Sequence, residues 1–180
     1  MSANQELFEF KFYEWEKKFR DNPYLRQPFG DEWEEYTWGK VGDMARRLAT
    51  GLKSLGLRDG AHIGIYSKNC REWIISDLAI VMAGYVSVPF FPSLNGKELS
   101  YIMEYGDVDA LFLGKIETWE DIKNDLPNDM PMITFPHYKG CSEVTRGLKW
   151  HDFINSYEPI QNPNKPKLSD LWTIIFTSGT

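Results

Sequence analysis

The stretch HIGIYSKNCREWIISDLAIVMAGYVSVPFFPS, residues 62–93, decides the fold class. It begins with HIGIYS, which is short, branched and apolar, as expected of a strand buried on both faces of a parallel sheet. Residues 71–83 are apolar nearly all round and predict a buried helix. Gly84 ends that helix, and YVSVPFF follows as a second strand, whose Pro89 must lie near the strand end or on a sheet edge.

The alternation of strands and helices continues on both sides of this stretch. Upstream, an apolar period of 3.6 residues runs from Val41 to Leu55 and predicts a helix that Gly56 ends. Downstream, the sequence predicts a helix, a strand, a shorter helix and another strand, at residues 95–105, 109–114, 118–125 and 132–135. This order predicts an α/β fold in which a mostly parallel sheet is flanked by helices and connected in the right-handed sense.

Two of the expected helices have the sequence of a capping box at their start. The pairs are Asn69 with Glu72 and Asn95 with Glu98. In such a box the asparagine side chain accepts a hydrogen bond from the glutamate amide, and the glutamate side chain reaches back to the asparagine amide. We therefore expect reciprocal capping at both positions.

Residues 1–36 predict an N-terminal helix and a hairpin, ahead of an α/β subdomain that spans residues 37–180. Gly30-Asp31, between two aromatic-rich runs, is typical of a hairpin turn. One face of the helix carries an aromatic stripe made of Phe8, Phe12, Trp15 and Phe19. We expect this stripe to face the core; a face that touches a partner or a membrane is the alternative.

The chain ends on LWTIIFTSGT, residues 171–180. It follows a proline- and asparagine-rich connector at residues 158–170. LWTIIF predicts a last buried strand, and TSGT would then lie where α/β sheets usually bind ligands. Hydroxyl groups and a flexible glycine backbone suit a phosphate. The candidate phosphate-binding residues are Thr177, Ser178, Gly179 and Thr180.

Charge, cysteine content and the motifs that are missing disfavour several classes of protein. A net charge of -6 and a pI near 5.1 predict no nucleic-acid partner. Cys70 and Cys141 form no disulfide or metal-binding pattern, which predicts a reduced, cytoplasmic setting. No apolar stretch is long enough for a bilayer, so any membrane contact is expected to be peripheral. The patterns GxxxxGK[ST], GxGxxG and GxSxG are absent, which disfavours P-loop NTPases, Rossmann dehydrogenases and α/β-hydrolases.

Residues 36–113, with SKNCREW and AGYVSVPFFPS in that order, resemble the N-terminal domain of the adenylate-forming acyl-CoA synthetases, especially the long-chain fatty acyl-CoA ligases. TSGT resembles the opening of that family's T-S-G-T-T-G-x-P-K phosphate loop. The resemblance implies an incomplete N-terminal domain of that fold, and ATP, Mg2+ and coenzyme A as cofactors. It also implies a small-molecule carboxylate as substrate; closeness of resemblance favours a fatty acid, and medium-chain acids, aryl acids and a luciferase-like substrate are the alternatives. The acid would react with ATP to give an acyl-adenylate and pyrophosphate, and the thiol of coenzyme A would then displace AMP.

The resemblance also implies which groups are missing. The lysine of the phosphate loop, the glutamate near magnesium and a C-terminal domain with a catalytic lysine do not occur in this chain. We therefore expect a truncated piece of a longer enzyme, with no catalytic or metal-binding residue and no ligase activity in isolation. The alternative is a free-standing, non-catalytic α/β module that binds a partner through its aromatic N-terminal helix.

Other polar residues are expected to have structural or surface positions. This applies to the three histidines, which are His62, His137 and His151. Lys68 and Arg71 are expected on the surface at a helix start, with an approach to a nucleotide or a pantetheine tail as the alternative. The sequence favours no oligomeric state, but a truncated sheet would expose an apolar face that could self-associate.

Overall fold

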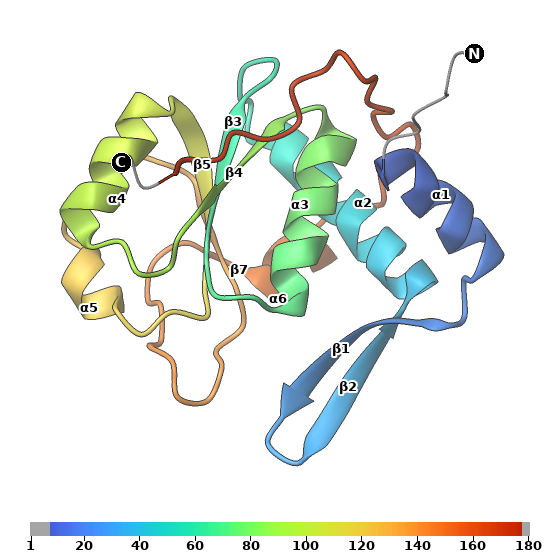
Figure 1. Cartoon of the computed structure of the whole chain (residues 1–180), viewed down its shortest axis with the longest axis horizontal. Helices are drawn as coiled ribbons and strands as arrows, with labels where there is room; N and C mark the ends of the chain where they lie inside the picture. The colour runs from blue at the N-terminus through green and yellow to red at the C-terminus, as the bar shows by residue number, and fades with distance from the viewer. Residues whose placement is uncertain (1–7, 178–180) are drawn as a thin grey trace.

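The structure is a computed structural model that describes residues 8–177, with side chains from residue 11 onward. Figure 1 shows a sheet with helices packed on it, and a helix and a hairpin to one side. The helices are α1 (Phe8–Lys18), α2 (Trp38–Ser54), α3 (Arg71–Ala83), α4 (Gly96–Tyr105), α5 (Trp119–Ile122) and α6 (Trp150–Asn155). The strands are β1 (Pro23–Phe29), β2 (Glu32–Thr37), β3 (His62–Tyr66), β4 (Val86–Phe90), β5 (Val108–Leu113), β6 (Met132–Thr134) and β7 (Leu148–Lys149).

Five strands form one parallel sheet in the order β4-β3-β5-β6-β7, which confirms the predicted α/β fold. Strand β3 lies between two neighbours, with Gly64 beside Val88 of β4 on one side and Leu111 of β5 on the other. Because helices cover both faces of the sheet, the apolar side chains of β3 are buried, as the run HIGIYS predicts. Strand β7 was not predicted, since two residues are too few to show a period.

The core has two halves, one on each face of the sheet (Figure 1). Helices α2, α3 and α6 cover one face, and α4 and α5 cover the other. Strand β5 contributes to both, because Ala110 and Phe112 point into the first half and Leu111 and Leu113 into the second. None of the helices within residues 8–177 combines the length and the apolar composition needed to cross a bilayer.

One of the two predicted capping boxes is confirmed and the other is wrong. The Asn95 side chain accepts a hydrogen bond from the Glu98 amide, and the Glu98 carboxylate accepts one from the Asn95 amide, both at 3.0 Å. Helix α3, in contrast, begins after Cys70 and has no side-chain cap. The Asn69 box fails because the Glu72 carboxylate receives hydrogen bonds from other side chains, described below.

The N-terminal helix and the β1–β2 hairpin are both present, and Gly30 at the hairpin turn has φ of 64°. Of the aromatic stripe, Phe12 is fully buried, whereas Trp15 is 37% exposed, so a wholly buried stripe is wrong. The side chain of Phe8 lies outside the described residues. The buried position next to Trp15 is Glu16, whose carboxylate receives both terminal nitrogens of Arg46 at 2.5 and 2.7 Å.

The connector at residues 158–170 contains no helix or strand, as predicted, and most of its residues are exposed. Asn164 attaches it to the end of α3: its backbone N–H donates to the Met82 carbonyl at 2.8 Å, and its side chain donates to the Val81 carbonyl at 3.2 Å. The connector therefore follows a defined path over the surface toward the edge strand β4.

Candidate functional site at the carboxyl end of the sheet

Residues 171–177, called here the terminal segment, run beside the edge strand β4. Ser87 of β4 donates its N–H to the Trp172 carbonyl and accepts the N–H of Ile174, both at 2.9 Å. The pairing is parallel, so the segment travels in the same direction as β4. Figure 1 shows it in red, crossing in front of β3 and β4 toward α4. It therefore leads to the carboxyl end of the strands, where open α/β sheets bind their ligands.

The prediction that residues 171–176 form a last buried strand is wrong. The segment makes a single bridge to β4, and Leu171 and Ile175 are 59% and 63% exposed. Phe176 is partly buried and stacks against Phe90, with 6.3 Å between the ring centroids. The side chains of an apolar strand become buried only if other elements pack on both of its faces. Among the described residues, this segment has a paired strand on one edge only.

Two hollows at this end of the sheet are lined by residues of the terminal segment. The first has a volume of about 340 Å³ and a mostly apolar wall, which includes Phe90, Leu94, Ile102, Phe176 and Thr177. The second has a volume of about 470 Å³, and its wall includes Ser67, Lys68, Asn69, Trp73 and Ile175. Phe91 lines both hollows, so they are neighbours.

Of the four predicted phosphate-binding residues, the structure describes one. Thr177 is exposed and lines the first hollow together with Ser93. Ser178, Gly179 and Thr180 lie outside the described residues, so their role stays a prediction. Within residues 8–177, no group of three or more histidine, cysteine or acidic side chains is placed to hold a metal ion.

Lys68 and Arg71 follow the same strand but occupy different environments. Lys68 lines the larger hollow, and its Nζ lies 2.6 Å from Oε1 of Glu117. Arg71 is only 7% exposed, so the expected surface position is wrong for this residue. Its guanidinium group instead contributes to a buried polar network.

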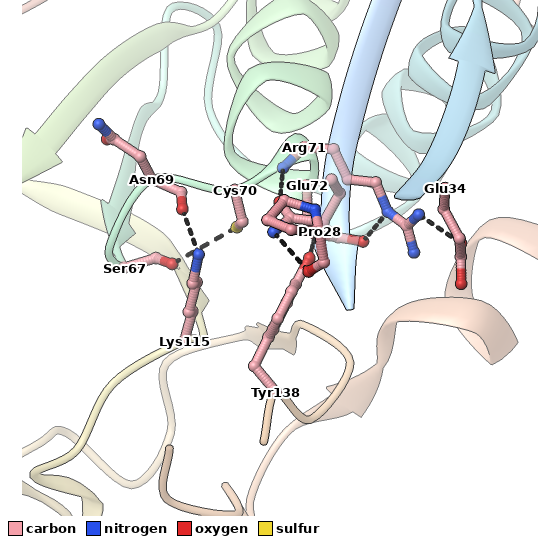
Figure 2. Close-up of polar contacts among 10 residues, drawn as sticks. Pro28, Glu34, Ser67, Asn69, Cys70, Arg71, Glu72, Lys115 and Tyr138 are labelled. Atoms are coloured by element: carbon pink, nitrogen blue, oxygen red, sulfur yellow. Dashed lines mark hydrogen bonds and ion pairs between the residues drawn. The ribbon is translucent and has the colours of Figure 1, made fainter. Parts of the chain in front are cut away.

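We call this network the α3 polar cluster and define it as Arg71, Glu72, Tyr138 and Glu34 (Figure 2). Arg71 donates from Nε to Glu72 at 2.9 Å and from a terminal nitrogen to Glu34 at 2.5 Å. The Tyr138 hydroxyl donates to the second carboxylate oxygen of Glu72. Glu72 is 1% exposed and Tyr138 5%. The cluster thus connects the hairpin, the start of α3 and the loop that follows β6.

Aromatic rings surround the buried guanidinium group. The central carbon of Arg71 lies 4.2 Å from the ring centroid of Tyr36 and 5.0 Å from that of Phe29. Phe29 also stacks on Tyr138, with 5.3 Å between the ring centroids. A second cation, Lys115, lies over the Tyr138 ring, with its Nζ 5.0 Å from the ring centroid. The contacts with Phe29 and Tyr36 supply cation–π attraction to the Arg71 charge, which is removed from water.

The pKa values in this region favour fixed protonation states. Burial by itself lowers the pKa of Arg71, but hydrogen bonds to Glu72 and Glu34 raise it above its ordinary value. Burial, reinforced by the Glu72 charge, raises the pKa of the Tyr138 hydroxyl, and the same two causes raise the pKa of the Cys70 thiol to about 11. Arg71 therefore stays charged, Tyr138 stays a donor and Cys70 stays a thiol near neutral pH. This is typical of a structural cluster and not of a proton-transfer site.

The sequence contains one signal that could have revealed the cluster. Arg71 and Glu72 are adjacent charged residues at the start of a helix that is otherwise apolar nearly all round. Because a buried charge needs a partner, two such residues on a buried helix indicate an internal ion pair. Their distant partners, Glu34 and Tyr138, have no comparable sequence signal.

The histidines and cysteines occupy positions of the kind expected for structural or surface residues. His62 places Nδ1 2.6 Å from the Gly106 carbonyl oxygen, and His137 places Nε2 3.0 Å from that of Cys141. His151 is exposed, and Cys70 and Cys141 are both free thiols. His137 and His151 line a hollow of about 320 Å³ at the ends of β5 and β6. The two hollows beside the terminal segment are lined by no histidine among the described residues.

The family model described as AMP-binding enzyme matches residues 12–180. The chain belongs to the AMP-binding enzyme family. The match includes the parallel sheet, the terminal segment and the sequence TSGT, and it confirms the resemblance stated above. In this family the chain is similar to Long chain acyl-CoA synthetase 4 from Arabidopsis thaliana, with 31% identity over 91% of the chain. It is also similar to the rat long-chain-fatty-acid–CoA ligase ACSBG2, with 25% identity over 94% of the chain.

The chain spans 27% of the length of each of these two relatives. Among solved structures, it resembles the anthranilate CoA ligase AuaEII in complex with anthranoyl-AMP, with a TM-score of 0.79, 21% identity and coverage of 95% of the chain and 32% of the ligase. It also resembles a benzoate CoA ligase from Burkholderia xenovorans LB400, with a TM-score of 0.76, 16% identity and coverage of 92% and 32%. At these identities the likeness establishes the fold of this AMP-binding enzyme segment.

Proposed function

We propose that this chain is part of an ATP-dependent fatty acid–CoA ligase and contributes the beginning of its phosphate-binding loop. One observation carries the proposal. In a member of the AMP-binding enzyme family, the terminal segment runs parallel to β4 and brings Thr177 to a hollow at the carboxyl end of the sheet. The parent reaction would convert a carboxylate and ATP into an acyl-adenylate and pyrophosphate, and then transfer the acyl group to coenzyme A.

The proposed role of TSGT is to donate hydrogen bonds to phosphate oxygens. Thr177 and Ser93 line the same hollow, and each has a hydroxyl group that can donate a hydrogen bond to a phosphate oxygen. No lysine or arginine lines this hollow among the described residues. ATP, when bound, supplies pyrophosphate as a leaving group. In this proposal, the residues that neutralise the phosphate charge and hold Mg2+ do not belong to the part described here. Preorganised donors of this kind stabilise charge that develops during phosphate chemistry.

A fatty carboxylate is the proposed substrate class. The two relatives named above are called long-chain enzymes, and this supports a substrate that is largely hydrocarbon. Coenzyme A is proposed as the acyl acceptor because the chain belongs to the AMP-binding enzyme family and its named relatives are CoA ligases.

The alternative, a partner-binding module that uses its aromatic helix, has less support from the geometry. Phe12 is fully buried and stacks among Tyr24 and Trp38, so this part of the stripe is not offered to a partner. Trp15 is 37% exposed and also contacts Trp38. A helix whose aromatic side chains pack mainly inside its own domain gives little surface to a second protein.

Pyrophosphate release tests the proposal in two forms of the protein. The isolated chain, given ATP, Mg2+ and fatty acids, is expected to release no more pyrophosphate than a heat-killed control, because most of the ligase is missing. The longer protein that contains this sequence is expected to form acyl-CoA. In that protein, Thr177→Val should lower the adenylation rate by about 10- to 100-fold, since one donor to the developing charge is lost.

Ser169→Ala is the matched control, because Ser169 is an exposed hydroxyl in the connector, before the terminal segment. This variant should keep the full rate. Equal rates for Thr177→Val and Ser169→Ala, or acyl-CoA formation without ATP, would contradict the proposed function.

A further inference from the structure

Phe176 lies in the part of the terminal segment where backbone pairing has stopped. The last backbone hydrogen bond to β4 is the one that Ile174 donates to Ser87, at 2.9 Å. Among the described residues, Ile175, Phe176 and Thr177 make no backbone hydrogen bond. Of these three residues, only Phe176 is partly buried. The position of Thr177 in the first hollow therefore depends on how the Phe176 side chain packs.

The Phe176 ring lies between strand β4 and helix α4. It stacks on Phe90 of β4, with 6.3 Å between the ring centroids and 13° between the ring planes. Tyr105, at the end of α4, meets the ring edge-on, with 6.1 Å between the centroids. Stacked and edge-on arrangements are the ones that aromatic pairs favour. The ring also packs against the second half of the core, so two different elements hold it.

Gly106, which follows α4, leaves room for this ring. A β-carbon on Gly106 would lie 3.1 and 3.2 Å from two carbons of the Phe176 ring, and 3.1 Å from the Ile102 carbonyl oxygen. Carbon atoms that are not bonded prefer a separation of about 3.5–4.0 Å. The ring would therefore have to move by a few tenths of an ångström if residue 106 had a side chain. Gly106 has φ of -82°, so its own backbone does not require glycine.

We propose that Phe176 is a positioning residue for the phosphate-binding loop. Its ring, held by β4 and α4, fixes the point at which the backbone leaves the sheet and enters TSGT. The inference rests on the proposed function, in which the hydroxyl of Thr177 is a hydrogen-bond donor. Donors of this kind stabilise developing charge only if the surrounding structure fixes them before the reaction. In this role Phe176 acts through Thr177 and not by contact with a substrate.

The test measures the two half-reactions separately in the longer protein that contains this sequence. Adenylation is followed by the exchange of labelled pyrophosphate into ATP in the presence of a fatty acid. Acyl transfer is followed by supplying a synthetic long-chain acyl-adenylate together with coenzyme A. Phe176→Leu should lower the adenylation rate about 10-fold or more, since a misplacement of about 1 Å can cost about 100-fold. Acyl transfer should change less than about twofold, because the charge that TSGT stabilises in this proposal develops in the first step.

Phe19→Leu is the matched control for this substitution. Phe19 is partly buried, as Phe176 is, but it follows α1, which lies on the other side of the molecule from α4 (Figure 1). Phe19→Leu should keep the full rate of both half-reactions.

Gly106→Ala tests the packing without removing the ring. Gly106 lines neither hollow beside the terminal segment, so its effect on adenylation must pass through its neighbours. We expect Gly106→Ala to lower the adenylation rate by about 3- to 10-fold. Added to Phe176→Leu, the same substitution should cost less than about twofold more, because the ring that it displaces is no longer there.

Hydrogen exchange gives a readout that needs no turnover. The amide of Ile174 donates to Ser87, so it is protected while the terminal segment stays paired with β4. In the longer protein without ATP, Phe176→Leu should speed the exchange of this amide about 2- to 10-fold relative to Phe19→Leu, which corresponds to the loss of an aromatic contact.

Three results would overturn the inference. The first is an adenylation rate in Phe176→Leu equal to that in Phe19→Leu. If Thr177→Val lowers the rate in that case, only the positioning role is wrong; if it does not, the proposed function fails as well. The second result is an equal loss in both half-reactions, which general damage to packing would cause. The third is unchanged exchange of the Ile174 amide in Phe176→Leu.

Discussion

The α3 polar cluster lies at the start of α3 and the terminal segment lies beside β4, and the two regions differ in how completely they are covered. The cluster holds Glu72 at 1% exposure, and each of its charges has a partner within hydrogen-bond distance. The terminal segment makes two backbone hydrogen bonds to Ser87 and leaves Ile175 63% exposed. Charged residues are thus inside and apolar residues outside, the reverse of what side-chain polarity alone would predict.

This comparison teaches that burial depends on the neighbours that are present and not on polarity alone. In the cluster, three segments distant in sequence converge, so the ion pair is satisfied and screened from water by Phe29 and Tyr36. Beside the terminal segment, among the described residues, one strand and one helix are present. The cluster is therefore expected to contribute more to the stability of this chain than the terminal segment does.

Removal of the buried cation should give the largest effect on stability. Arg71→Ala leaves Glu72 buried without its cation, and we expect the free energy of unfolding to fall by about 3–5 kcal/mol. Glu34→Gln removes the other carboxylate, which is 55% exposed, and should cost about 1 kcal/mol or less. Urea unfolding of both variants measures the difference. Equal losses in the two variants would show that the buried contact with Glu72 and the exposed contact with Glu34 contribute equally to stability, and the proposed difference would be wrong.

The Cys70 thiol sharpens the comparison through pH. Its pKa is raised from 9.0 to about 11 in the folded chain, first by burial and then by Glu72. Between pH 9 and 11 the unfolded chain loses this proton more readily than the folded chain, so stability should fall as pH rises. The fall due to this group is about 2–3 kcal/mol at most.

Urea unfolding at pH 9, 10 and 11, under reducing conditions, measures this slope. Cys70→Ala should lose the part of the slope that belongs to Cys70, whereas Cys141→Ala should keep it, because Cys141 is partly exposed. The Cys70 charge is also one cause of the raised pKa of Tyr138, so the slope lost in Cys70→Ala includes this coupling. An identical slope in Cys70→Ala and the unsubstituted chain would show that the thiol contributes nothing.

Local sequence patterns predicted the sheet, and long-range contacts explain the errors. The run HIGIYS, the period from Val41 to Leu55 and the Asn95 box each depend on neighbours within one element, and all three are confirmed. The Asn69 box failed because Tyr138, 66 residues after Glu72, donates to the same carboxylate. No local pattern includes a partner at that separation.

In the candidate site, too, the local pattern was predictable and the long-range contacts were not. The sequence placed the TSGT turn after an apolar run, and Thr177 does lie at the carboxyl end of the sheet. The burial of that run was predicted wrongly, because an apolar run of six residues has the same sequence whether its outer side is covered or open. Coverage depends on chain that is not adjacent in sequence, so no pattern within residues 171–176 could have indicated it.

The smallest expected effect uses one chemical change at two positions. Ile63→Val and Ile175→Val each remove one methylene group, but Ile63 is fully buried in β3 and Ile175 is 63% exposed. In the isolated chain we expect a loss of about 1 kcal/mol for Ile63→Val and about 0.3 kcal/mol or less for Ile175→Val, measured by urea unfolding. Equal losses at the two positions would show that the side chain of Ile175 is as well covered as that of Ile63, and the contrast between a covered strand and an open segment would be wrong.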